Sequence, residues 1–329
     1  SGALAGFAAG TVLSCVISII FAYPILHQQR FPKTHFSLHQ VKMAMVTILT
    51  PVIPFLIANL SGVLMVNSDL LALKLMADTT QADLMTGYYQ VATVLARVPY
   101  FLGQAIMWII FPLIARQVGR PLLANRESRF GLQLTISFIL MINVVMMVIP
   151  NVVLAFFFPP AYVSVGPTLR ILAAAMSFNI LAQILATILQ ARDRAWISAW
   201  ALSAAVIVQL LALSWAVPSW GMQGAAWASF TAAGLASLMM IIGAYHAFPA
   251  MLSLSFSTIV KQLIAFGVLV LILAPLPIIS RIPTLLWITA SIGAYVATLL
   301  VLQIFTVEWA KILPFQLPSF IHKFILRSY

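Results

Sequence analysis

A stripe of polar and aromatic residues is the strongest candidate for chemistry in this sequence. Arg97 lies about ten residues into an apolar segment, residues 87–114, where a charged side chain is costly and usually faces a cavity or a polar partner. On a helix that turns 100° per residue, six side chains of this segment fall within an arc of roughly 80°. They are Gln90, Thr93, Arg97, Tyr100, Gln104 and Trp108.

Such a stripe can line a water-filled path, or it can join helices by hydrogen bonds. The absence of an acid on the stripe favours the path, and a buried pair of Arg97 with Asp69 is the alternative. In a path, an arginine suits a phosphate, which it binds with two parallel hydrogen bonds. The amide and aromatic side chains suit sugars. A weaker, uncharged stripe in residues 167–190 either lines the same path or joins helices; it contains Asn179, Gln183, Thr187 and Gln190.

Asp69 is the one acid close to an apolar segment, since it follows residues 42–66 near the expected outer surface. It could cap the next segment, pair with Lys74 or take part in ion coupling.

The sequence contains no motif of zinc proteases, P-loop ATPases, dithiol redox proteins, serine hydrolases or dinucleotide-binding proteins. His35 and His39 have helical spacing but no acid or cysteine nearby. We therefore predict no catalytic residue, metal site or cofactor, and do not expect an enzyme.

The elements that must position these residues are membrane helices. Of the 329 residues, 63% are hydrophobic and 7% charged, whereas an average soluble domain is roughly a quarter charged. So little charge cannot cover a water-facing surface, which excludes a soluble enzyme, a disordered chain and a DNA-binding domain. Runs near 20 apolar residues favour helices over a β-barrel. The composition predicts an all-α, polytopic membrane helix bundle that contacts lipid, with no nucleic-acid partner despite a net charge of +11.

The pattern predicts nine spans and their orientation. The spans are residues 2–26, 42–66, 87–114, 130–157, 167–190, 196–218, 222–247, 262–279 and 284–305. Thirteen of the 17 lysines and arginines lie in one set of alternate loops and the C-terminal tail, and three lie in the other set. Because basic residues accumulate in cytoplasmic loops, residue 1 is expected outside and Tyr329 in the cytoplasm.

The first residues carry no signal-peptide pattern, and Gly2, Gly6 and Gly10 form a run that lets two membrane helices approach closely. A helix built for close packing suggests partners that precede it. We therefore expect this chain to be the C-terminal part of a longer protein.

Three segments carry a resemblance to a known family. The first segment runs from the end of the second span through the third and contains Asp69, then Gly87-Tyr88-Tyr89, then Pro112. The other two segments are NILAQILATILQARDRAWISAW, residues 179–200, and PSWGMQGAAWASF, residues 218–230. Together they resemble the multidrug/oligosaccharidyl-lipid/polysaccharide flippase superfamily, in its polysaccharide-exporter branch, over most of residues 1–305.

The resemblance implies a fourteen-helix protein with two six-helix lobes around a central cavity. Residues 1–28 would be the last helix of an N-terminal lobe, 29–41 a cytoplasmic linker, 42–247 the six-helix C-terminal lobe, 248–305 two additional helices and 306–329 a cytoplasmic tail. Known flippases of this family move lipid-linked sugars by alternating access, with cationic residues attracting the pyrophosphate. That role would fall here on Arg97.

The resemblance therefore implies a flippase for undecaprenyl-pyrophosphate-linked oligosaccharides in a bacterial inner membrane, serving O-antigen, capsule or exopolysaccharide assembly beside a polymerase or ligase. Two alternatives stay open. A multidrug or small-solute cation antiporter of the same superfamily would need a membrane-embedded acid, for which Asp69 is the candidate. A membrane glycosyltransferase or ligase usually carries a large outer loop, and the longest one expected here has only about twenty residues.

Overall fold

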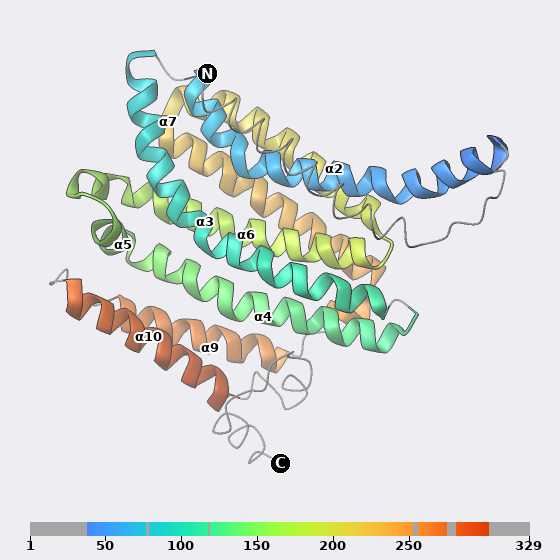
Figure 1. Ribbon diagram of the computed structural model, residues 1–329. Helices are drawn as coiled ribbons and strands as arrows, with labels where there is room; N and C mark the ends of the chain where they lie inside the picture. The colour runs from blue at the N-terminus through green and yellow to red at the C-terminus, as the bar shows by residue number, and fades with distance from the viewer. Residues whose placement is uncertain (1–37, 77–78, 118, 253–255, 275–280, 303–329) are drawn as a thin grey trace, which may run out of the picture. The chain divides into compact units, whose positions relative to one another are not determined.

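The structure, a computed structural model, describes residues 38–76, 79–117, 119–252, 256–274 and 281–302 (Figure 1). Within these ranges every regular element is a helix, which confirms the predicted all-α class. The first predicted span, most of the predicted linker and the predicted tail, residues 306–329, lie outside the described residues. The chain divides into two units, residues 1–49 and 50–329. Of the first unit only residues 38–49, the start of α2, are described, so the following account concerns the second.

Five stretches are long and apolar enough to cross a membrane: Val52–Leu75, Ala82–Arg116, Leu122–Val148, Pro160–Ala191 and Ala195–Ala247. They belong to α2 (Leu38–Met76), α3 (Thr79–Arg116), α4 (Pro121–Val148), the 3₁₀ helix η1 (Pro160–Val165) with α6 (Gly166–Ala191), and α7 (Ala195–Ala247). The chain is thus a multi-pass membrane protein. The apolar parts of α9 (Phe256–Leu273) and α10 (Arg281–Val301) are shorter, so the number of nine spans stays a prediction.

The predicted fourth span, residues 130–157, differs from the helices observed there. α4 starts at Pro121, nine positions earlier, because proline is well suited to the first turn of a helix and the polar residues that follow it continue the helix. α4 then ends at Val148, and α5 (Pro150–Phe157) follows. Proline disfavours helical geometry at the residue before it, and Ile149 accordingly has φ −122° and ψ 50°.

α7 is two antiparallel helical segments joined at Gly221, where φ is 54° and ψ is −129°. Gln209 donates a hydrogen bond to Ser229 Oγ at 3.2 Å, although a straight helix would separate residues 20 positions apart by about 30 Å. The chain therefore reverses direction at Gly221. The positive φ needed for this reversal favours glycine, which has no side chain to clash with the backbone. The two predicted spans 196–218 and 222–247 correspond to these two segments.

α6 is the central helix of the second unit, since it packs against α3, α4 and α7 and buries a larger share of its residues than any of them (Figure 1). Close contact depends on small residues. A Cβ atom on Gly103 of α3 would lie 2.3 Å from Cδ1 of Ile180 on α6, so the two helices approach closely only because position 103 has no side chain.

α9 and α10 lie side by side, and α9 packs against α4 (Figure 1). A polar cluster joins the three helices: Gln262 Nε2 donates to Ser137 Oγ and to Tyr295 Oη, each at 3.2 Å. The Tyr295 hydroxyl in turn donates to the Ser137 carbonyl at 2.8 Å. These hydrogen bonds specify where the two C-terminal apolar helices attach, because apolar surface alone gives little driving force for association inside a membrane.

Gly224→Ala should destabilise the α7 hairpin. A Cβ atom at position 224 would lie 2.0 Å from the backbone oxygen of Ala216, so the two segments must separate. We expect a loss of about 1–3 kcal/mol, visible as a lower thermal unfolding midpoint in detergent. Gly234→Ala is the matched control, because a Cβ atom there meets nothing within 4 Å. Equal midpoints for the two variants would contradict the hairpin geometry.

Candidate functional site

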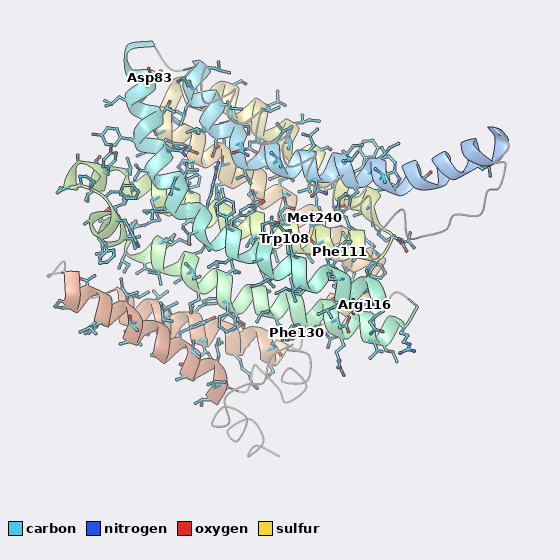
Figure 2. The ribbon with its side chains drawn as sticks, viewed as in Figure 1. Asp83, Trp108, Phe111, Arg116, Phe130 and Met240 are labelled. Atoms are coloured by element: carbon cyan, nitrogen blue, oxygen red, sulfur yellow. The ribbon has the colours of Figure 1, made fainter. Side chains whose placement is uncertain are left out.

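A hollow of about 770 Å³ lies between α2, α3 and α6. Four of the residues predicted to line a substrate path border it: Tyr100, Gln104 and Trp108 from α3, and Gln183 from α6. Thr187 and Gln190 of the weaker predicted stripe also border it. Figure 2 shows Trp108 and Phe111, another lining residue, along α3 between Asp83 near its start and Arg116 at its end. The two stripes thus meet in one hollow.

The lining offers amide and hydroxyl groups from all three helices. Gln104 Nε2 donates to the Tyr100 hydroxyl at 2.9 Å, which orients both side chains on α3. Gly62 of α2 makes room for Gln183, because a Cβ atom on Gly62 would lie 2.3 Å from Gln183 Nε2. Asn59 of α2 also borders the hollow and was not singled out from the sequence, since it lies outside both stripes. Amides both donate and accept, so the lining can bind a ligand rich in hydroxyl groups.

A second polar region surrounds the carboxylate of Asp69, which is fully buried in α2. Its Oδ2 accepts hydrogen bonds from the Tyr89 hydroxyl of α3 at 2.7 Å and from Ser229 Oγ of α7 at 3.2 Å. Its Oδ1 accepts from the backbone N–H of Leu70 at 2.8 Å. Three helices therefore contribute to one carboxylate, as expected for an acid that has lost contact with water.

Gln209 extends this region, which we call the Asp69 cluster: Asp69, Tyr89, Ser229 and Gln209. Gln209 Nε2 donates to the Met65 carbonyl at 3.0 Å as well as to Ser229. Sequence analysis missed Gln209 and Ser229 and found Tyr89 only through the family resemblance. The available signal for Gln209 was a lone amide inside a long apolar run, which is costly unless it has partners.

Arg97 lies toward the Asp69 cluster. One guanidinium nitrogen donates to the Val66 carbonyl of α2, three positions before Asp69. Within the described ranges the two residues form no ion pair at contact distance, and Arg97 Nε is buried without a hydrogen-bond partner. Arg97 does not line the hollow, but it precedes Tyr100 by three residues, about one helical turn.

The remaining predicted site residues lie apart from the hollow. Gln90 is exposed, and Thr93 is buried with its hydroxyl donating to the Tyr89 carbonyl at 2.9 Å. Asn179 is buried, and its Oδ1 has no hydrogen-bond partner in the described part of the chain. Two of the roles considered for Asp69 do not occur in the part of the chain that the structure describes. Lys74 forms its ion pair with Asp83, at 3.4 Å on the surface, and Asp69 lies inside α2 rather than at the start of α3, where it could cap that helix.

No protein-family model matches this sequence, and a search of curated proteins finds no match. The functional argument therefore depends on the geometry of the hollow and of the Asp69 cluster.

Tyr89→Phe should destabilise the folded protein, because it removes the shortest side-chain hydrogen bond to a buried carboxylate. We expect a loss of about 2 kcal/mol, the usual contribution of a hydrogen bond to a charged group, measured as a lower unfolding midpoint in detergent. Tyr88→Phe is the control: Tyr88 packs on Tyr162 at a ring distance of 5.1 Å, a contact that phenylalanine keeps. Similar midpoints for both variants would mean that Asp69 does not depend on Tyr89.

Proposed function

We propose that this chain is part of a membrane flippase that moves lipid-linked oligosaccharides, of the undecaprenyl-pyrophosphate type, by alternating access. The observation that carries the proposal is the hollow of about 770 Å³, lined by amide, hydroxyl and aromatic groups on helices that are otherwise apolar. Polar groups inside a membrane are costly, so amide and hydroxyl groups that gather around one hollow between membrane-length helices are best explained by a polar substrate that passes through it.

The chemistry of the lining favours sugars. In the described part of the chain no lysine, arginine, aspartate or glutamate borders this hollow, so its lining suits an uncharged ligand. Its amides can pair with sugar hydroxyls. Trp108, 77% exposed, and Phe101, 63% exposed, offer flat apolar faces on which the C–H face of a sugar ring can stack.

Arg97 would bind the pyrophosphate. It lies about one helical turn from Tyr100, and its Nε has no partner within the described residues. A pyrophosphate at this position would complete the hydrogen bonding of the guanidinium, while the attached sugars occupy the hollow. The polyprenyl tail would stay in the lipid, beside exposed apolar residues such as Leu56 and Leu60 of α2.

In this proposal the protein works in a bacterial inner membrane with residue 1 outside and Tyr329 in the cytoplasm. The substrate would be made on the cytoplasmic side and delivered to a polymerase or ligase on the other. The rest of a two-lobe cavity would come from a preceding segment of the full protein.

Arg97→Ala in the full-length protein should slow translocation of lipid-linked oligosaccharide about tenfold or more, the expected cost of losing a charge-assisted hydrogen bond to phosphate. The measurement is transfer of a fluorescently labelled substrate across reconstituted vesicles. Arg120→Ala, which removes an exposed charge between α3 and α4, should leave the rate unchanged. A normal rate with Arg97→Ala would remove Arg97 from the proposed path.

A cation-coupled antiporter is the second candidate function, and the Asp69 cluster is the observation that favours it. Coupling to a cation requires an acid within the membrane, and Asp69 is buried inside a membrane-length helix with two hydroxyl groups donating to its Oδ2. A carboxylate in such surroundings can exchange a proton or a cation for its hydrogen-bond partners.

For an antiporter, Asp69→Asn should reduce efflux of a cationic dye such as ethidium to the background rate, because asparagine keeps the shape but cannot bind a proton or a cation. The control is Asp83→Asn, an exposed acid paired with Lys74 at the surface. Dye efflux that is absent in the unmodified protein, or unchanged by Asp69→Asn, would rule out this candidate.

A further inference from the structure

A second, smaller hollow of about 390 Å³ adjoins the first, at the turn between α6 and α7. We call it the turn pocket. The two hollows share two lining residues, Phe55 of α2 and Gln190 of α6, so they meet at this pair. Beyond the pair, the turn pocket is bordered by Thr50, Asp193 and Trp196. Together the hollows form a row of polar and aromatic groups from Tyr100 to the α6–α7 turn.

The turn itself has a defined geometry. Asp193 adopts a left-handed backbone conformation with φ 59°, which aspartate and asparagine tolerate better than most residues. The backbone N–H of Arg194 donates to the Leu189 carbonyl at 2.8 Å and closes the turn. Asp193 is exposed, and among the described residues its carboxylate forms no ion pair. It therefore has acceptor capacity for a ligand.

Trp196 supplies the other element of a sugar site. It is 46% exposed, and its ring lies 6.3 Å from that of Trp200 with an interplanar angle of 28°. This partner holds the indole in place while leaving part of it accessible. A flat apolar face beside a carboxylate acceptor is a combination that matches the C–H face and hydroxyl groups of a pyranose.

The charge of the turn pocket indicates which part of a lipid-linked sugar it would accept. Among the described residues that border it, Asp193 is the one acidic or basic side chain, and a carboxylate repels a phosphate. The arginine before it points elsewhere: Arg192 donates to Asn125 Oδ1 at 2.7 Å and lies 3.5 Å from the centre of the Phe248 ring. The turn pocket thus suits hydroxyl-bearing sugar units rather than the pyrophosphate.

Resting on the proposed flippase function, we propose that the turn pocket is a sugar-binding vestibule. Trp196 stacks on a sugar ring, Asp193 accepts hydrogen bonds from its hydroxyls, and Phe55 with Gln190 separates this subsite from the main hollow. An oligosaccharide head would occupy the vestibule on its way to or from the main hollow. The vestibule lies on the side predicted to face the cytoplasm, where the substrate is made.

The test compares two kinds of probe on the full-length protein in lipid nanodiscs. One is bare undecaprenyl pyrophosphate, and the other is a panel of undecaprenyl pyrophosphates that carry one to three hexose or N-acetylhexosamine units. Trp196→Ala should weaken binding of the sugar-bearing probes about tenfold and leave the bare probe unchanged. Asp193→Asn, which keeps the turn because asparagine tolerates its φ, should weaken the same probes at least threefold.

Trp215→Ala is the matched control, because Trp215 is 64% exposed and packs against another tryptophan, Trp220, without bordering either hollow. It should change neither affinity. If the unmodified protein binds both kinds of probe and the Trp196 and Asp193 variants bind them equally well, the vestibule is overturned while the flippase proposal stands. If the unmodified protein binds neither kind, the flippase proposal fails, and the vestibule fails with it.

Discussion

The burial of the Asp69 carboxylate is the constraint on which the arrangement of the second unit depends. A charge removed from water is tolerated only when hydrogen bonds replace its hydration. Here those hydrogen bonds come from Tyr89 of α3 and Ser229 of α7, and Gln209 ties the same serine to the Met65 carbonyl of α2. Inside a membrane, where apolar surface does little to pull helices together, such contacts specify which helices become neighbours.

α3 connects this cluster to the main hollow. Its polar residues divide at Arg97: Tyr89 and Thr93 lie in or beside the cluster, and Tyr100 and Gln104 border the hollow. Arg97 lies at the division and interacts with α2 through the Val66 carbonyl. The two regions therefore share both α2 and α3, so a change in the hydrogen bonding of Asp69 acts on helices that also form the walls of the hollow.

The hairpin in α7 and the central position of α6 determine how the remaining polar groups are presented. Reversal at Gly221 returns the second half of α7 along the first, which brings Ser229 beside Gln209 and places Phe248 near the α6–α7 turn, where Arg192 contacts its ring. With Arg192 engaged there, Asp193 and Trp196 remain to border the turn pocket. One turn thus serves both the packing of the bundle and the proposed vestibule.

The sequence alone was sufficient to predict the membrane class, the all-α fold and the approximate positions of the helices that the structure describes. Hydropathy and helical periodicity are properties of neighbouring residues, so the six stripe residues between Gln90 and Trp108 could be placed on one face of a helix. The sequence could not show that this face divides between a cluster and a hollow. Nor could it show that Gln209 donates a hydrogen bond to the Met65 carbonyl, 144 positions away. Those outcomes depend on how deeply each helix sits and how it is rotated against its neighbours, which packing contacts such as Gly62 with Gln183 and Gly103 with Ile180 decide. Only the tertiary structure contains that information.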